Sequence, residues 1–355
     1  MVRTIARPAA AIALAIALVS LVLLALGASP AGVFAALVEG AFGNWYACTD
    51  TLVKATPLVF AGLAVSVAFS GGLWNIGADG QLTAGAIAAG AVGPRLNGMP
   101  HLLAIAIVLG AGAAGGALWG AIAGWLRARR DVNEVISTIM LNFIAVQTLS
   151  WTVHGPLMEA SGAYPASVPI ADSAKLAFYF IPSRLNSGML LAIALAIACY
   201  LMLSRTTAGF ELRAMGHNRR AAAFFGIPIA ALTVRTMTLC GALAGIGGAV
   251  QIAAITHRLY EKFSPGWGYE AIAVALVARL NPLGVIVAAL LFGALDNGSQ
   301  AMQRAQGVSP VLVQVIQGMV ILILLTLDTP LFNELRGRLQ NNAVASPVEG
   351  ERRDA

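Results

Sequence analysis

The sequence predicts an all-α protein that crosses a lipid membrane about ten times, partly through interrupted helices. Hydrophobic residues make up 58% of the chain and charged residues only 11%, and the mean hydropathy is +0.80. A soluble domain carries about 25% charged residues, so lipid must cover much of this surface. At about 20 residues per crossing, the 355 residues leave room for roughly ten spans.

The N-terminus predicts an uncleaved first span. Arg3 and Arg7 precede an apolar run over 9–28, which is longer than the usual signal-peptide core of about 7–15 residues. Further apolar windows follow, and some are too short to cross the membrane alone, so eight spans remain an alternative to ten. The windows cover 52–70, 73–92, 102–126, 132–153, 188–203, 231–256, 269–280, 283–297 and 311–327.

The basic residues predict the orientation of the spans. When the windows alternate across the membrane from a cytoplasmic N-terminus, most of the 22 Lys and Arg residues fall on the cytoplasmic side, and the cluster at 127–130 is the clearest marker. Both termini are then cytoplasmic. We expect one transmembrane domain over 1–339, a proline-containing external loop over 155–187, and a disordered cytoplasmic tail over 340–355.

The segment 205–228 is the one long basic stretch between apolar windows. Its arginines place it at the cytoplasmic surface. A structured cytoplasmic segment without a further soluble domain predicts a docking site for a partner. The alternative is a basic helix that lies on anionic lipid.

Several kinds of chemistry have no motif in this chain. The sequence holds no G-x-x-x-x-G-K-[ST] phosphate loop, no H-E-x-x-H zinc motif and no G-x-S-x-G nucleophile elbow. Cys48, Cys199 and Cys240 are too scattered for a metal cluster or a disulfide framework. The net charge of +6 follows the membrane topology and predicts no nucleic-acid binding. We therefore expect no catalytic residue, no metal and no cofactor bound by this chain.

Two apolar windows are interrupted by helix-breaking residues. Gly71 and Gly72 break the first, and Gly266, Gly268 and the pair at 281–282 bracket the second. Paired broken helices point to a substrate site near the membrane midplane, although glycines also simply permit close helix packing.

Polar residues near these breaks are candidates for the substrate pathway, because polar groups at membrane depth usually face a cavity or a partner. Asp79, between Gly77 and Gly80, is the strongest of them, whereas Glu134 could simply cap a helix end near Arg130. The predicted pathway residues are Trp74, Asn75, Asp79, Gln81, Asn142, Phe143, Glu270 and Asn297.

Four stretches carry a family resemblance. They are NIGADGQLTAGAIAAG from residue 75, EVISTIMLNFIA from 134, LRAMGHNRRAAAFFGIP from 212, and PLGVIVAALLFGALDNGSQAMQ with GVSPVLVQVIQGMVIL from 282. As a set covering 57–327, they resemble the membrane permease subunits of bacterial ABC importers of the branched-chain amino acid/ribose type. The first two stretches look most like the nucleoside and simple-sugar permeases.

The resemblance implies a multi-pass protein of the bacterial inner membrane that imports a nucleoside, a related ribosyl compound or a simple sugar. It implies cytoplasmic ATPase subunits that bind the ATP, a second permease (a related chain or a second copy) and an external substrate-binding protein. It also implies that a short helix within 205–228 fits a groove on the ATPase. The matching residues are Arg213, Met215, Gly216, His217, Asn218, Arg219, Arg220, Phe224, Phe225 and Gly226.

Two other classes of function stay open from the residues alone. An ion- or proton-coupled secondary transporter would use Asp79, Glu270 and Asp296 as ion sites, but it would leave 205–228 without a role. A membrane enzyme would need a clustered catalytic set, and the sequence offers none.

Overall fold

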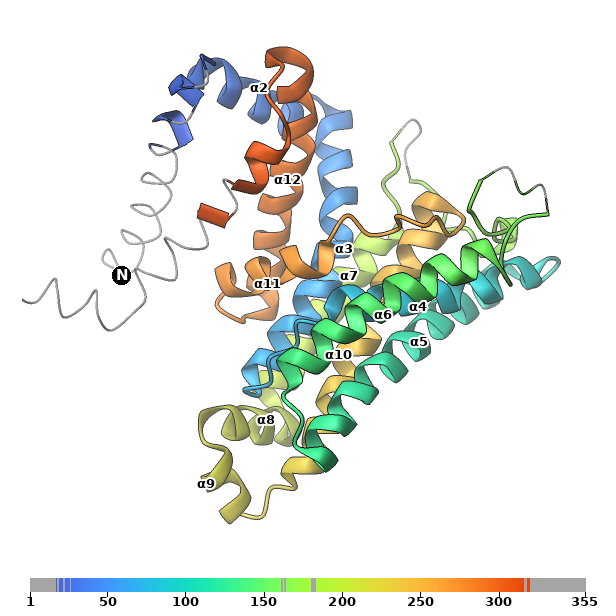
Figure 1. Ribbon diagram of the computed structural model, residues 1–355, viewed down its shortest axis with the longest axis vertical. Coiled ribbons are helices and arrows are strands. Elements are labelled where there is room, and N and C mark those ends of the chain that lie inside the picture. The colour runs from blue at the N-terminus through green and yellow to red at the C-terminus, as the bar shows by residue number, and fades with distance from the viewer. Residues whose placement is uncertain are drawn as a thin grey trace, which may run out of the picture. The chain divides into compact units, whose positions relative to one another are not determined.

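The regular elements of the protein are helices (Figure 1). The computed structural model describes residues 17, 19–21, 23–25, 27–160, 162, 164–179, 183–315 and 318–319. Within them, extended pairing is limited to three isolated β-bridges. The chain divides into two compact units, residues 33–310 and residues 1–32 together with 311–355. All of the predicted site residues lie in the first unit.

Six described helices are long and apolar enough to cross a membrane. The all-helical prediction is confirmed, whereas the count of ten spans and the side of the termini stay predictions. The predicted first span, the end of the last window and the tail over 340–355 lie largely or wholly outside the described residues. The six helices are α3 (Trp45–Ser70), α5 (His101–Arg130), α6 (Glu134–His154), α7 (Ser187–Arg205), α10 (Ile229–Gln251, extended by the π-helical turn Ile252–Thr256) and α12 (Pro282–Gln306).

Shorter helices complete the architecture. The 15-residue α4 fills most of the predicted window 73–92, and the 11-residue α11 fills most of 269–280. No span is predicted between the first span over 9–28 and the window 52–70, yet this stretch forms α2 and the first turns of α3. The shorter helices are α2 (Pro30–Phe42), α4 (Ala78–Val92), α8 (Thr207–His217), α9 (Arg219–Phe224) and α11 (Trp267–Val277), with 3-10 turns at Gly93–Leu96 and Asp172–Ala174.

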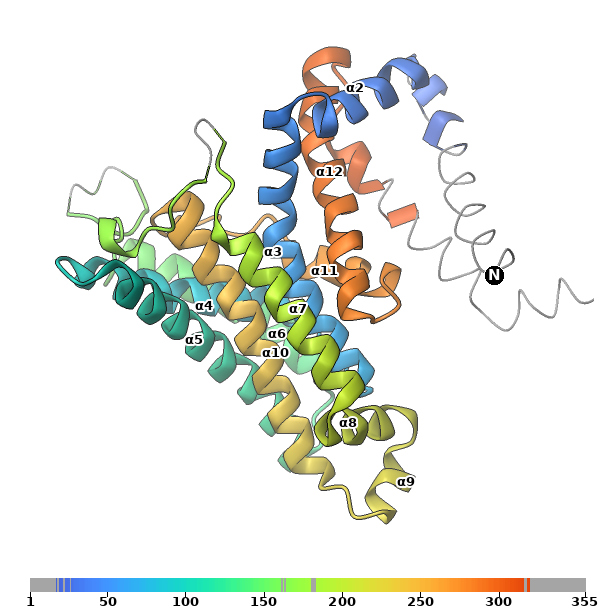
Figure 2. The same cartoon turned by 180° about the vertical axis from the view of Figure 1, so that it is seen from behind.

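Helix α3 forms the centre of the larger unit, with 83% of its apolar window buried, and packs against α4, α7, α10, α11 and α12. It ends beside α8, and Figure 2 shows α7 leading directly into α8 at that end. The start of α3, α2 and the loop over 155–187 lie at the opposite end. The loop follows the chain beyond α10, where the Ile170 amide donates to the His257 carbonyl at 2.9 Å.

Helices α5 and α10 pack backbone against backbone through glycines. Gly112 and Gly116 on α5 face Gly241 and Gly245 on α10, and a Cβ atom added at Gly245 would overlap the Gly112 carbonyl oxygen. Small residues one turn apart allow this approach, which provides dispersion contacts where lipid supplies no hydrophobic driving force. Close helix packing therefore accounts for these glycines of α5 and α10.

Gly245→Ala should destabilise the protein by about 1–3 kcal/mol, because the new methyl group must push the α5 backbone away. The measurement is the midpoint of thermal unfolding in detergent. Gly110→Ala is the matched control, since a Cβ atom at Gly110 meets no atom within 4 Å. Equal midpoints for the two variants would contradict the packing role of Gly245.

Candidate functional site: the junction of the broken helices

The chain leaves the helical path between α3 and α4. Gly72 has a φ of +69°, a left-handed conformation that favours glycine. Its amide donates to the Phe69 carbonyl at 3.0 Å, which closes the end of α3. The next helical residue is Ala78. The predicted interruption at Gly71 and Gly72 is therefore present, and the non-helical stretch continues through Gly77.

Two amide side chains fix the shape of this interruption. Asn75 and Gln81 form a reciprocal pair, in which each amide nitrogen donates to the other amide oxygen at 3.1 Å. Asn75 Oδ1 also accepts from the Gly77 amide at 3.1 Å. Asn75 is fully buried and Gln81 is 2% exposed. An unpaired amide would be costly at this depth, so the pair holds the backbone in one non-helical path.

Asp79 joins the start of α4 to the start of α11. Its Oδ1 accepts from Ser264 Oγ at 2.7 Å and from the Gly268 amide at 3.0 Å. Hydrogen bonds to a carboxylate are stronger than those to a neutral acceptor, and the N-terminus of a helix favours negative charge. Gly268 is required here because a Cβ atom at that position would overlap the Asp79 backbone. Asp79, in the first turn of α4, thus caps the start of α11.

Asn142 brings α6 to the same junction. Its Oδ1 accepts from the Gly80 amide at 2.9 Å, and its Nδ2 donates to the Ile76 carbonyl at 2.9 Å and to the Tyr269 hydroxyl at 3.1 Å. The side chain is 2% exposed. One residue therefore bonds the interruption, the first turn of α4 and the beginning of α11. The three elements are thereby linked through a single buried side chain.

Four of the eight predicted pathway residues meet at this junction, namely Asn75, Asp79, Gln81 and Asn142. Glu270 follows Tyr269 on α11 and is half-buried. Trp74 is 55% exposed and packs on Phe69, with ring centroids 4.9 Å apart. The remaining two are Phe143, which is 60% exposed on α6, and Asn297, which is buried on α12.

Ser264 and Tyr269 belong to the junction but were not predicted. Ser264 Oγ accepts from the Gly266 amide at 3.1 Å and from the Trp267 amide at 3.3 Å while it donates to Asp79. A serine just before a helix start is a recognisable capping signal. The sequence S-P-G-W-G therefore indicates a helix start near Ser264. It does not indicate that Ser264 bonds to Asp79, which lies far away in the chain.

The basic segment forms α8 and α9 at one end of the unit. Asn218 ends α8 and caps α9, because its Oδ1 accepts from the Arg220 and Ala221 amides at 3.1 and 3.0 Å. Phe224 and Phe225 close α9 with 87% and 81% of their surface exposed. Their rings form an edge-to-face pair with centroids 5.8 Å apart. An aromatic pair this exposed presents an apolar anchor to a partner or to lipid.

The other face of this segment packs on the broken helix. Leu212 and Met215 are each 3% exposed, and a Cβ atom at Gly71 would overlap the Leu212 side chain. A Cβ atom at Gly216 would overlap the Ser70 carbonyl oxygen. Met215 and Gly216 therefore connect α8 to the interruption. The exposed members of the predicted docking set are Arg213, Gly216, His217, Asn218, Arg220, Phe224, Phe225 and Gly226, whereas Arg219 is half-buried and Met215 is buried.

Comparison with known proteins agrees with this architecture. Residues 47–325 match the model of the family described as branched-chain amino acid transport system / permease component. The guanosine ABC transporter permease protein of Bacillus subtilis is 35% identical, over 89% of this chain and 91% of its own. The glucose ABC transporter permease protein of Haloferax volcanii is 33% identical, over 98% and 94%.

A third relative, the nucleoside ABC transporter permease protein of Lactococcus lactis, is 31% identical over 90% of each chain. No solved structure matches the fold. Independent secondary transport is not favoured, because these relatives are ABC transporter permeases. The chain belongs to the branched-chain amino acid transport system / permease component family, and it is a multi-pass permease subunit of an ABC transporter.

Proposed function

We propose that this permease forms the membrane pathway of an ATP-driven importer for a nucleoside, a related ribosyl compound or a simple sugar in a bacterial inner membrane. The relatives include a guanosine, a nucleoside and a glucose ABC transporter permease protein. These compounds are uncharged and rich in hydroxyl groups. Amide and carboxylate side chains such as those of this chain can exchange hydrogen bonds with them.

The α8–α9 end faces the cytoplasm in this proposal. Arg127 and Arg129, at the end of α5, share this end with Arg213 and Arg220, because the last turns of α5 pack on the first turns of α10. Basic residues concentrate on the cytoplasmic side of membrane proteins. The loop over 155–187 then faces outward, where the external binding protein delivers substrate.

Single-cysteine labelling tests this orientation. In a background without the native cysteines, Arg129→Cys and His217→Cys should react only with a reagent that reaches the cytoplasm. Asp172→Cys should react with an impermeant maleimide added outside. All three positions are exposed, so poor access cannot explain a missing signal. External labelling of His217→Cys would reverse the assigned orientation.

The observation that carries the proposed function is that the α8–α9 segment has one face exposed to a partner and the other packed on the interrupted helix. Its exposed Phe224–Phe225 pair is available to an ATPase groove, while Met215 and Gly216 pack on the interruption that leads to Asp79. A push on α9 would therefore reach the start of α11 through α8, the interruption and the Asp79 contacts. ATP binding and hydrolysis on the partner subunits would in this way change access to the pathway, which a second permease helps to line.

Reconstitution tests the function directly. The permease, its ATPase, a second permease and the binding protein are placed in proteoliposomes with ATP on the ATPase side. We expect ATP-dependent accumulation of radiolabelled adenosine or D-ribose. The permease without an ATPase, under a proton or sodium gradient, is the control and should accumulate neither compound. Accumulation by the permease alone would support secondary transport instead.

A further inference from the structure

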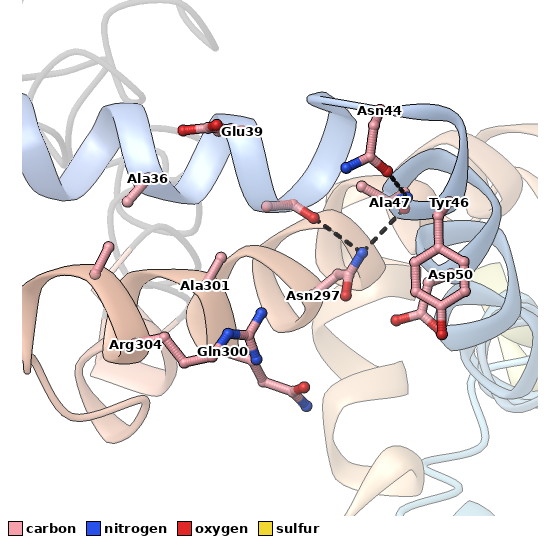
Figure 3. Close-up of a pocket in the computed structure, with 12 residues that line it drawn as sticks. Ala36, Glu39, Asn44, Tyr46, Ala47, Asp50, Asn297, Gln300, Ala301 and Arg304 are labelled. Atoms are coloured by element: carbon pink, nitrogen blue, oxygen red, sulfur yellow. Dashed lines mark hydrogen bonds between the residues drawn. The ribbon is translucent and has the colours of Figure 1, made fainter.

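A polar pocket opens between α2, α3 and α12 (Figure 3), and Figure 1 shows these elements meeting at the end opposite α8 and α9. Its volume is about 440 Å³, within the range of about 300–1,000 Å³ that is typical of small-molecule sites. The junction around Asp79 does not contribute to its lining. The residues that argue for a ligand are Glu39, Tyr46, Asp50, Gln300 and Arg304.

The two long walls of the pocket carry polar side chains at matching helical intervals. Tyr46, Asp50 and Lys54 lie one turn apart along α3, and Asp296, Gln300 and Arg304 lie one turn apart along α12. Residues four apart share one face of a helix. The two helices run antiparallel, because α3 begins next to α2 and α12 ends there. We call these two facing rows the polar ladder.

An ion pair sets the register of the ladder at its inner end. Lys54 Nζ lies 3.1 Å from Asp296 Oδ2, and the nitrogen is shielded from solvent. One and two turns outward from this pair, α3 carries Asp50 and Tyr46 and α12 carries Gln300 and Arg304, and all four line the pocket. Ionised groups at membrane depth usually pair or face an aqueous cavity. Lys54 and Asp296 pair with each other, one helical turn inward from the pocket-lining residues Asp50 and Gln300.

The walls are held in place independently of any ligand. Asn297 Nδ2 donates to the Gly40 carbonyl at 3.1 Å, to the Ala47 carbonyl at 3.0 Å and to Thr51 Oγ1 at 3.1 Å. Figure 3 shows two of these bonds reaching from α12 to α2 and α3. Asn297 therefore acts here as a positioning residue. A preformed pocket loses less entropy when a ligand binds.

The lining chemistry selects a neutral ligand with several hydroxyl groups. Glu39 and Asp50 accept hydrogen bonds, Arg304 donates them, and Gln300 can do both. Two carboxylates against one guanidinium disfavour a phosphate or a carboxylate. The half-exposed ring of Tyr46 offers an apolar face against which a sugar ring or a base could pack.

We propose that this pocket is an external binding site of the permease for a neutral polyhydroxylated ligand, with the Lys54–Asp296 pair closing its inner end. The proposal rests on the proposed function, and it adds a location and named contacts. The ligand reaches the pocket from the binding protein and must pass the ion pair to move inward. The polar ladder is then the first protein surface that the released substrate meets.

Protection from labelling tests occupancy of the pocket. Gln300→Cys is made in a Cys48→Ser background and assembled with its partners, and spheroplasts are treated with an impermeant maleimide. We expect whichever of adenosine or D-ribose the importer takes up to slow this reaction at least fivefold at saturating concentration. Adenosine monophosphate should not slow it. Unchanged labelling by a compound that is taken up normally would overturn the pocket, and protection by the monophosphate alone would overturn its preference for neutral ligands.

A charge-removing variant tests whether the pocket serves transport. Asp50→Asn keeps the shape of the side chain and should lower uptake about tenfold while the assembled complex remains at its normal level. Asp172→Asn is the matched control. Asp172 is exposed outside the pocket, and the hydrogen bond from Lys175 lowers its pKa, so this change also removes one external negative charge. Wild-type uptake by Asp50→Asn, or an equal loss in both variants, would contradict a role for the pocket. Absence of uptake by the unmodified importer would instead contradict the proposed function.

Discussion

Asp79→Ala should reduce uptake at least thirtyfold and leave a normal amount of permease–ATPase complex in the membrane. The change removes the acceptor of Ser264 Oγ and of the Gly268 amide, at 2.7 and 3.0 Å. A buried donor without a partner costs about 1–3 kcal/mol. The start of α11 should then shift away from α4. The contacts of α8 lie on the other side of the interruption and should persist, so assembly is expected to survive.

Asp79→Asn separates a structural role from a role of the charge. The amide oxygen can still accept from Ser264 and Gly268, so a purely structural cap should regain most of the lost uptake. If the negative charge itself acts in transport, the neutral amide cannot substitute for it, and uptake by Asp79→Asn should stay as low as that of Asp79→Ala. Uptake and co-purified ATPase are measured together for each variant. Normal uptake by Asp79→Ala would remove Asp79 from the functional site.

The sequence predicted the interruption and half of its polar network for a local reason. Asn75, Asp79 and Gln81 stand out because polar residues are rare in apolar windows and glycines surround them. The distances between them along the chain are short, so one backbone path brings them together. Asn142 was also identified as polar within a span. Its bonds to Gly80 and Tyr269 depend on the packing of α6 against α4 and α11, which no local pattern encodes.

The polar ladder was not predicted because its rows belong to distant parts of the chain. Tyr46 and Asp50 of the ladder, like Glu39 of the pocket, lie before the first residue of the predicted window 52–70. Gln300 and Arg304 lie beyond the end of the window 283–297. Helix propensity and packing extend α3 and α12 past both limits. The pocket forms only where the first turns of α3 and the last turns of α12 lie side by side, next to α2.

The double variant Phe224→Ser and Phe225→Ser should abolish coupling to the ATPase while the permease remains in the membrane. Buried aromatic anchors often contribute 2 kcal/mol or more to an interface, and about 1.4 kcal/mol corresponds to a tenfold change in affinity. Loss of both anchors should therefore lower the affinity for the ATPase more than a hundredfold. The free permease should tolerate the change, because both rings are almost fully exposed.

The measurements are co-purified ATPase, substrate-stimulated ATP hydrolysis and uptake, and all three should fall together. Tyr164→Ser is the control, since Tyr164 is 79% exposed at the opposite end of the unit. It removes a comparable exposed aromatic ring and should change none of the three. If the double variant retains uptake and bound ATPase, α9 is no docking helix. Its aromatic pair would then be assigned to the lipid surface. The ATPase would have to act on the Asp79 junction through another surface, and the exposed face of α8 is the nearest one.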